Sequence, residues 1–191
     1  MSTPAERLTF DAEAYLAWEA EQHEKHEYLR GEVFAMVGAR QEHVLVALNL
    51  ASALKQRLRG GPCRAYVSDM KLCVAAADAF FYPDVMVSCD GRDFDAEHFL
   101  EHPTLIIEVL SSGTEAFDRG AKAAAYRLLP SLREYVLVDT DARRLEAYRR
   151  TDAGDWLLHD CRPEEGACHL ASLDLSLPFE EIFEDLAPSA Y

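Results

Sequence analysis

The sequence predicts an α/β domain arranged around a mixed β-sheet. Three observations lead to this prediction. Short runs rich in Val, Ile and Leu, bounded by Pro, Gly or Ser, are typical of strands that are covered on both faces. Segments with apolar residues at helical spacing lie between these runs, and alternating segments near both ends indicate added antiparallel hairpins. With 191 residues, the chain can form one sizeable core, so we expect a single domain over residues 1–191.

The first third of the chain predicts a helix, a hairpin and a second helix. Thr9 is the expected N-cap of a helix from about residue 10 to 24, with apolar residues on one side and acids on the other. Residues 27–37 have the pattern of a hairpin with a tight turn at Arg30-Gly31. Apolar residues then recur at helical spacing from about residue 41 to 58, where a Gly-Gly-Pro sequence ends the helix.

The rest of the chain predicts buried strands, one more long helix and a tail of hairpins. The strands are expected near residues 63–75, 80–89, 104–110 and 133–139. A helix should begin after Thr114 and run to about Leu129, where Pro130 stops it. Residues 144–178 alternate like a set of antiparallel hairpins, and a short amphipathic helix over residues 179–186 closes the chain.

Cysteine usage and the N-terminal residues indicate a cytoplasmic protein. The five cysteines are odd in number and form no C-x-x-C pair: Cys63, Cys73, Cys89, Cys161 and Cys168. We therefore expect reduced core thiols and no zinc site made from them. The N-terminal residues lack the basic flank and apolar core of a signal peptide. No apolar stretch is long enough to cross a bilayer, so a membrane partner is not expected.

The net charge of −15 argues against a nucleic-acid partner, because nucleic-acid-binding proteins usually carry a basic surface. Any basic surface must therefore be local. The basic residues cluster in two segments: Lys55, Arg57, Arg59 and Arg64, then Arg143, Arg144, Arg149 and Arg150. The overall charge lowers the expectation of DNA binding without excluding it, since a bound dication neutralises the acids that hold it.

Two acidic residues interrupt the most apolar of the predicted strands. Glu108 lies in the run 104–110, and Asp84 lies in the run 80–89. A buried carboxylate is costly unless a metal, a basic partner or a proton compensates for its lost hydration. Two acids on neighbouring strands therefore indicate one site for a hard cation, because Mg²⁺ prefers carboxylate oxygens and usually keeps several waters.

The residues around these acids carry a family resemblance. Pro83-Asp84, followed by a strand with Glu108, resembles the PD-(D/E)XK nuclease superfamily. Four longer strings resemble the Uma-type family of restriction endonucleases within that superfamily: Phe81–Val87, Pro103–Ser111, Asp118–Lys122 and Tyr126–Asp139. The resemblance spans about residues 8–186. It implies a restriction-endonuclease-like fold, dependence on Mg²⁺, for which Mn²⁺ can substitute, and cleavage of phosphodiester bonds in DNA.

One position departs from the superfamily pattern. The lysine that normally lies two residues after the glutamate, on the same strand face, is replaced by Leu110. The Uma-type resemblance offers Lys122, early in the following helix, as a substitute. Asp118, Lys122 and Tyr126 are spaced four apart along one helix face. Lys122 therefore either serves catalysis or simply pairs with Asp118.

The resemblance implies metal-assisted hydrolysis. Asp84, Glu108 and the carbonyl of Val109 would bind Mg²⁺, which polarises the scissile phosphate and lowers the pKa of a bound water. Lys122 would orient that water or stabilise the developing charge. The structural alternative for Glu108 is an ion pair with a nearby basic residue, and for Asp84 it is a turn after the proline.

Glu27 and His43 are two weaker catalytic candidates. Glu27 would supply a further carboxylate from the hairpin, and His43 at the start of the next helix would contact a phosphate or water. Both have common structural roles as alternatives. A hairpin glutamate is usually a surface carboxylate, and a histidine at a helix start usually forms a local hydrogen bond.

Three other motifs are set aside. Asp69-Met-Lys71 matches (D/E)-x-K but precedes the Pro-Asp element, so a charge pair on a strand face is the better interpretation. His23-Glu-Lys-His-Glu27 is not the H-E-x-x-H motif of zinc proteases. Ser111-Ser112 has no evident base beside it and fits a turn or a helix cap.

Two functions other than that of a DNA endonuclease remain open. A non-catalytic binding or assembly module is motivated by the net acidity and by Leu110. A metallohydrolase of small phosphorylated substrates would need no basic surface. A nuclease that cuts both strands must place two sites on one duplex, so a homodimer is also expected. Residues 156–158 (Trp-Leu-Leu) are candidates for that contact, with core packing as the alternative.

Overall fold

Two mixed sheets and one separate hairpin contain the strands of this chain. The computed structural model describes residues 10–36 and 38–187. Within this part, the five-stranded sheet has the order β2 (Glu32–Ala35), β1 (His26–Leu29), β5 (Ala79–Phe81), β4 (Lys71–Val74) and β7 (Phe99–Leu100). The six-stranded sheet has the order β11 (Trp156–Cys161), β10 (Arg144–Arg150), β9 (Glu134–Asp139), β8 (Leu105–Val109), β6 (Val85–Ser88) and β3 (Arg64–Val67). The hairpin consists of β12 (Ala167–Leu170) and β13 (Leu175–Pro178).

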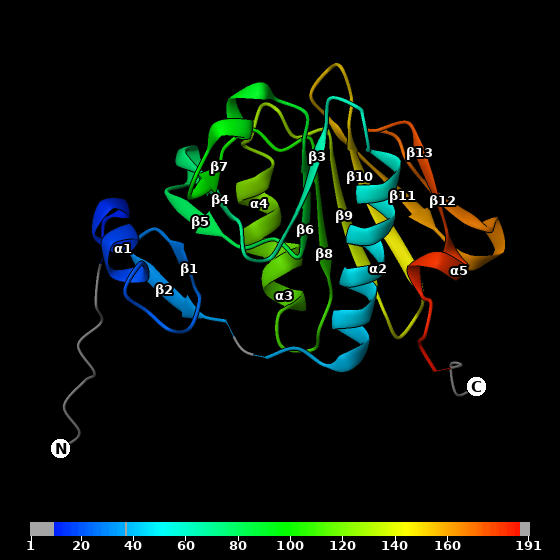
Figure 1. The fold of residues 1–191 in the computed structure, drawn as a ribbon, viewed down its shortest axis with the longest axis horizontal. Helices are drawn as coiled ribbons and strands as arrows, with labels where there is room; N and C mark the ends of the chain where they lie inside the picture. Colours follow the sequence, from blue (N-terminus) through cyan, green and yellow to red (C-terminus); the bar gives the residue numbers. More distant parts are fainter. Residues whose placement is uncertain (1–9, 37, 188–191) are drawn as a thin grey trace.

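Helices flank both sheets (Figure 1). The α-helices are α1 (Ala12–Glu19), α2 (Gln41–Arg57), α3 (Glu115–Phe117), α4 (Ala123–Tyr126) and α5 (Phe179–Ile182). A π-helical turn, η3 (Asp118–Lys122), joins α3 to α4. Short 3₁₀ turns are η1 (Ala75–Ala77), η2 (Gly91–Asp95) and η4 (Pro163–Glu165). The predicted α/β class with mixed sheet structure flanked by helices is confirmed, although the strands divide between two sheets where one was expected.

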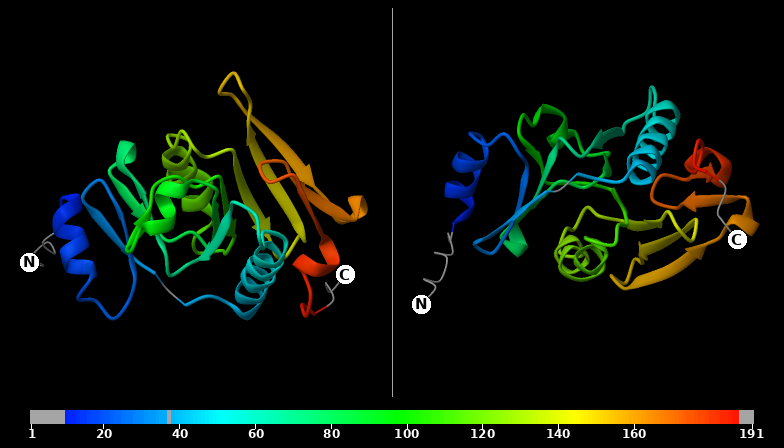
Figure 2. Two further views of the ribbon diagram at one scale, coloured as in Figure 1. Left: turned by 45° about the horizontal axis from the view of Figure 1, so that its top comes forward. Right: turned by 90° about the horizontal axis from the view of Figure 1, so that it is seen from below.

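The six-stranded sheet is covered on both faces. Val85 and Ile107 pack with Leu50 of α2 in one core cluster, whereas Met86 and Ile106 pack with Tyr126 of α4 in another. Alternate residues of β6 and β8 thus face opposite layers. Figure 2 shows α2 on one side of these strands and the α3–α4 segment on the other. The prediction that residues 104–110 form a strand buried on both faces is confirmed, because all five residues of β8 are buried.

The segment from α3 to α4 packs against both sheets. Tyr126 shares its core cluster with Leu72 and Phe81 of the five-stranded sheet and with Met86 and Ile106 of the six-stranded sheet. Side chains on the buried face of this helical segment can therefore contact residues of both sheets.

The chain passes from one sheet to the other at residues 82–84. β5 pairs with β1 and β4 in the five-stranded sheet, whereas β6 pairs with β3 and β8 in the six-stranded sheet. Pro83 lacks an N–H group and cannot continue a strand ladder. The single strand predicted for residues 80–89 is therefore wrong, and Asp84 lies just before β6. The strand predicted for residues 63–75 likewise divides into β3 and β4.

The N-terminal helix is shorter than predicted. Asp11 is its N-cap, and the carboxylate accepts a hydrogen bond from Ala14 N at 2.8 Å; the predicted cap, Thr9, lies outside the described residues. The helix ends at Glu19, whose carboxylate accepts a hydrogen bond from His26 N at 2.9 Å and so holds the chain as it turns back into β1. The predicted hairpin that follows is confirmed as β1 and β2.

The other predicted elements are found close to their expected positions. The helix predicted for residues 41–58 is α2, and the buried strand predicted for residues 133–139 is β9. The helix predicted for residues 114–129 is the α3–η3–α4 segment. The C-terminal tail forms the antiparallel pair of β10 and β11 and the separate β12–β13 hairpin, as expected.

Four of the five cysteines form disulfides, so the expectation of reduced thiols is wrong for them. Cys63 pairs with Cys89, and Cys161 pairs with Cys168. Cys63 and Cys89 flank the registered pair Arg64 and Ser88 of β3 and β6, so strand pairing brings them together. Their separation of 26 residues in sequence gives no sign of this proximity. Cys73 is the buried free thiol, as predicted.

The apolar residues considered for a dimer contact divide between core and surface. Trp156 packs against the core, and Arg150 lies 4.9 Å from its ring centroid. Leu157 and Leu158 are 60% and 55% exposed on β11, at the edge of the six-stranded sheet. The homodimer stays a prediction. Over residues 10–36 and 38–187, the helices are too short or too polar to span a membrane.

Glu134 shows how this sheet accommodates a purely structural acid. It is fully buried in β9. One carboxylate oxygen accepts hydrogen bonds from Arg149 Nε at 3.0 Å and Ala171 N at 3.3 Å. The other accepts from Ser172 N at 3.0 Å and Ser172 Oγ at 2.8 Å. The acid therefore joins β9 and β10 to the loop after β12.

We expect Glu134→Ala to lower the free energy of unfolding by about 3 kcal/mol, because it leaves buried donors without their acceptor. Urea denaturation followed by circular dichroism measures this loss. Glu24→Ala, at an exposed position, should change stability by less than about 0.5 kcal/mol. Equal stabilities of the two variants would contradict the structural role of Glu134.

Candidate active site

The structure brings Asp84 and Glu108 together at the edge where the two sheets meet. β6 and β8 pair with Val85 opposite Ile107, which places Asp84 beside Glu108. The backbone N–H of Asp84 donates to Glu108 Oε2 at 3.2 Å, and the backbone N–H of Val109 donates to Asp84 Oδ2 at 2.8 Å. Each carboxylate is thus held by the backbone of the other strand, and the two acids form one unit.

Lys122 lies against the buried side of this unit. Its ammonium Nζ is 2.8 Å from Glu27 Oε1, 3.2 Å from Glu108 Oε1 and 3.4 Å from Asp118 Oδ1. All four side chains are buried. Lys122 ends the π-helical turn η3, a type of local widening that is frequent at functional sites. The predicted pairing with Asp118 is therefore present, but it is the longest of the three contacts.

Hydrogen bonds fix the acids around Lys122. The hydroxyl of Tyr126 donates to Glu108 Oε1 at 2.8 Å. The backbone N–H of Tyr82 donates to Glu27 Oε1 at 3.0 Å. Glu27 belongs to β1 and is only 6% exposed. The interpretation of Glu27 as a surface carboxylate of the hairpin is therefore wrong.

His43 contacts the outer side of the acid pair. It lies in the first turn of α2, and its Nε2 is 3.2 Å from Asp84 Oδ2. Burial lowers the pKa of His43, but hydrogen bonding and attraction to Asp84 outweigh that effect and raise it above its ordinary value. The imidazole thus favours its charged form beside this carboxylate.

The pKa values of Glu108 and Lys122 show an imbalance of charge. Burial is the main cause that raises the pKa of Glu108, and the nearby Asp84, Asp118 and Glu27 raise it further against the lowering effect of Lys122. Burial also lowers the pKa of Lys122, but attraction to Glu108, Glu27 and Asp118 dominates and raises it. The Lys122 ammonium therefore stays charged, whereas burial favours the neutral form of the Glu108 carboxyl group. The cluster formed by Lys122, Glu27, Glu108, Asp118 and Asp84 therefore carries less positive charge than its four carboxylates would need.

This donor set fits a divalent cation. Two carboxylates and a backbone carbonyl are hard oxygen ligands, and Mg²⁺ commonly takes only one or two protein carboxylates while keeping several waters. A dication beside Asp84 and Glu108 would supply the charge that the cluster lacks. Among the described residues, no group of three or more His, Cys, Asp or Glu side chains is arranged to bind a metal ion. Any metal here must therefore rely on the acid pair, the backbone and water.

Leu110 and the Asp69-Met-Lys71 motif do not enter this group of charged residues. Leu110 is 8% exposed and packs in the core that includes Tyr126. Asp69 lies in the turn between β3 and β4 and pairs with Lys25, so the predicted charge pair on a strand face is wrong. Lys71 Nζ instead lies 5.7 Å from the centroid of the Tyr82 ring.

The sequence predictions gave Asp118 only the role of an ion-pair partner for Lys122 and gave Tyr126 no role, although the structure places both beside Glu108 and Lys122. Their spacing of four residues on either side of Lys122 was the available signal. The spacing alone could not show that the helix lies between two sheets and faces Glu108. That information depends on tertiary packing.

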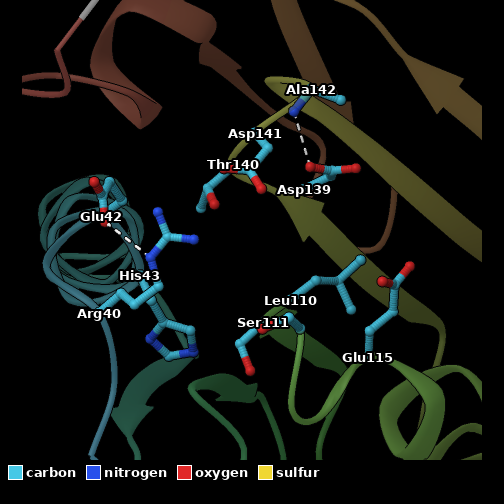
Figure 3. A pocket seen from close by; sticks show the side chains of 11 residues that line it. Arg40, Glu42, His43, Leu110, Ser111, Glu115, Asp139, Thr140, Asp141 and Ala142 are labelled. Atoms are coloured by element: carbon cyan, nitrogen blue, oxygen red, sulfur yellow. Dashed lines mark hydrogen bonds and ion pairs between the residues drawn. The ribbon is translucent and has the colours of Figure 1, made fainter. Parts of the chain in front are cut away.

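A pocket of about 230 Å³ adjoins the acid pair on the His43 side. Figure 3 shows it between the start of α2, the residues after β8 and the turn between β9 and β10. We call it the side pocket; its lining residues are Arg40, Glu42, His43, Leu110, Ser111, Ser112, Glu115, Asp139, Thr140, Asp141 and Ala142.

Most of the clustered basic residues have contacts within the protein. Arg57 pairs with Glu181, Arg144 with Glu146 and Arg149 with Glu134. Others donate to backbone carbonyls: Arg64 to Phe94, Arg143 to Ala187 and Arg150 to Leu129. Lys55 and Arg59 are exposed. Six of the eight basic residues of the two sequence clusters therefore have partners within the described part of the protein.

Two mixed sheets packed on a shared helix, with an acid pair at their junction, define a restriction-endonuclease-like fold. A crystal structure described as that of a putative nuclease belonging to DUF820, from Anabaena variabilis, has the same fold. Its TM-score is 0.73 at 17% sequence identity, over 91% of this chain and 97% of that one. The family model Uma2, described as "Putative restriction endonuclease", matches residues 12–180, so the chain belongs to the Uma2 family.

Two Synechocystis sp. proteins, both described as uncharacterized, are similar in sequence. One is 37% identical over 97% of this chain and 96% of its own length. The other is 35% identical over 80% of this chain and 88% of its own length. Membership in the family supports a nuclease function in general, with a nucleic acid as substrate, and proteins of this kind generally use divalent metal ions.

We expect Lys122→Met to lower the free energy of unfolding by about 3–5 kcal/mol near pH 8, because it removes the cation from three buried acids. The pKa values of these acids already lie above their ordinary range in the folded state. Loss of Lys122 raises them further, so the folded state binds more protons than the unfolded state. Stability should then fall as pH rises, more steeply than in the unmodified protein.

Urea denaturation between about pH 5 and pH 8 tests this dependence. Lys55→Met, at an exposed position, is the matched control and should follow the unmodified protein. Parallel stability curves for Lys122→Met and Lys55→Met would show that Lys122 does not hold the acids in their charged form.

Proposed function

We propose that this protein is a Mg²⁺-dependent endonuclease that hydrolyses phosphodiester bonds of DNA, with Mn²⁺ able to replace Mg²⁺. The observation that carries the proposal is the interlocked pair of Asp84 and Glu108, with Lys122 at 3.2 Å from Glu108. The family description as restriction endonucleases supports DNA as the substrate.

Asp84, Glu108 and the carbonyl of Val109 are the proposed metal ligands. Both contacts that hold the Asp84 carboxylate fall on Oδ2, which leaves Oδ1 for a cation. A bound divalent ion supplies a Lewis acid for the phosphate and lowers the pKa of a bound water. Because Glu108 is buried, bulk water competes little with a bound cation. The attraction between the carboxylates and the cation is therefore stronger than it would be in water.

Lys122 is proposed to stabilise negative charge and orient the attacking water. Its surrounding acids raise its pKa, so it remains an ammonium with N–H groups to donate and cannot serve as the general base. Glu27 and Asp118 hold this ammonium in place, and Tyr126 holds Glu108. These three are proposed positioning residues.

His43 is proposed to donate a hydrogen bond to the substrate phosphate or to a water. Its contact with Asp84 orients the ring and favours the protonated form. A charged imidazole on the outer side of the acid pair also provides positive charge for an approaching phosphodiester.

Lys122 answers one of the two reasons for considering a non-catalytic module. That hypothesis rests on the net acidity of the chain and on Leu110 at the usual lysine position. Lys122 reaches Glu108 from the neighbouring helical segment, so an ammonium is present at the acid pair even though the motif is changed. This arrangement supports an enzyme over a binding module.

We expect Asp84→Asn and Glu108→Gln each to lower metal-dependent cleavage by at least about 100-fold, because each removes a charged metal ligand. Nicking of supercoiled plasmid and cleavage of labelled oligonucleotides, with Mg²⁺ or Mn²⁺, measure this effect. Asp152→Asn, at an exposed turn position, is the matched control. Full cleavage by both acid variants would exclude these residues as the catalytic centre.

Metal binding should also be visible without catalysis. We expect Mn²⁺ to raise the unfolding temperature of the unmodified protein, since a ligand that binds only the folded state stabilises it by about 2.7 kcal/mol at 100 times its Kd. The Asp84→Asn variant should lose most of this stabilisation. A thermal denaturation series against Mn²⁺ concentration gives the measurement, and an equal shift in both proteins would place the metal elsewhere.

A further inference from the structure

The side pocket is linked to the proposed metal site through His43. His43 lines the pocket and also contacts Asp84. Leu110, another lining residue, follows Val109 in the chain, and Leu110 N donates to the backbone carbonyl of Val138 at 2.8 Å. A nucleic acid with its scissile phosphate at the acid pair would therefore bring an adjoining nucleoside to the pocket.

The charges on the pocket walls disfavour a second phosphate. Arg40 is the one arginine or lysine among the lining residues, and four acids line the pocket with it: Glu42, Glu115, Asp139 and Asp141. Lysine and arginine side chains are frequent partners of phosphate groups in proteins. An additional phosphate would instead face net negative charge.

Three of these acids already have partners and do not require a cation. Glu42 Oε2 lies 3.6 Å from Arg40 Nε. Glu115 Oε1 lies 2.8 Å from Arg119 Nε. Asp139 Oδ1 accepts a hydrogen bond from Ala142 N at 2.9 Å. The walls therefore present satisfied carboxylates that can still accept further hydrogen bonds from a neutral ligand.

The remaining walls combine hydroxyl groups with an apolar surface. Ser111, Ser112 and Thr140 provide hydroxyls, and Leu110 provides an apolar side chain. A nucleobase has a flat apolar face and an edge with N–H donors, which matches acceptor-rich walls beside an aliphatic group. The volume of about 230 Å³ lies below the roughly 300–1,000 Å³ of pockets for drug-sized ligands. It suits one ring system and excludes a base pair.

We propose that the side pocket binds a single unpaired nucleobase next to the scissile phosphodiester. The inference rests on the proposed nuclease function and specifies its substrate class as single-stranded or locally unpaired nucleic acid. A duplex would have to release a base from its stack to fill the pocket, and that cost gives the preference for unpaired substrates.

Nucleotide binding tests the pocket separately from cleavage. The probes are deoxyadenosine 5′-monophosphate and deoxyribose 5′-phosphate, which differ by the base, titrated into the full chain with Ca²⁺ and followed by NMR. We expect the nucleotide to bind at least about tenfold more tightly than the sugar phosphate. Cleavage of a labelled single strand should likewise be at least about tenfold faster than cleavage of the same sequence as a perfect duplex.

Two variants that fill the pocket should remove the base preference. Ala142→Phe and Ser112→Phe each place a ring at an exposed lining position. Ala153→Phe is the matched control, because Ala153 is an exposed residue in the next hairpin turn and does not line the pocket. Thermal denaturation identifies any variant that fails to fold. The affinity ratio should approach one in either folded pocket variant and remain at least about ten in the control.

The outcomes distinguish this inference from the proposed function. A base preference that disappears only in the pocket variants, in a protein that cleaves no nucleic acid, would support the pocket and overturn the nuclease. Equal affinity for both probes, with metal-dependent cleavage of duplex and single strand at the same rate, would overturn the pocket inference alone. A tenfold preference that persists in both pocket variants would also overturn it.

Discussion

The contacts of Lys122 with three buried acids are the constraint on which the site depends. Glu27 comes from the five-stranded sheet, Glu108 from the six-stranded sheet and Asp118 from the helical segment that packs against both. Burying one ammonium in this position is tolerated because the acids compensate for its lost hydration. The same excess of acid leaves Glu108 with a raised pKa and makes the outer side of the cluster suitable for a dication.

Glu134 and Glu108 show two ways of burying an acid in one sheet. Glu134 accepts four hydrogen bonds from Arg149, Ala171 and Ser172, so the protein itself compensates for the lost hydration of its carboxylate. Glu108 shares the ammonium of Lys122 with two other acids and lies beside Asp84. Burial alone is thus a poor guide to function. The balance of donors and charge around each carboxylate separates the structural acid from the candidate catalytic one.

Much of the fold and the centre of the site could be predicted from the sequence. Apolar runs with flanking turn residues located β8 and β9, and two intruding acids on neighbouring strands predicted that Asp84 and Glu108 would meet. The passage between sheets at Pro83 was missed, because an apolar run does not show where a strand changes partners. The burial of Glu27 was missed because it depends on which face of the hairpin meets the helical segment that carries Lys122. The cysteine pairs depend on register between distant segments, which residue spacing does not reveal.

The change of sheet at residues 82–84 makes this connection a joint between two halves of the molecule. Asp84 sits on that joint, while Tyr82 on the same short connection holds Glu27. Removing the N-terminal hairpin would therefore remove the Glu27 carboxylate that contacts Lys122. It would also remove the acceptor of the Tyr82 N–H on the connection that leads to Asp84. A fragment that keeps all the acids around Lys122 therefore cannot begin at α2, even though Asp84 and Glu108 both follow that helix.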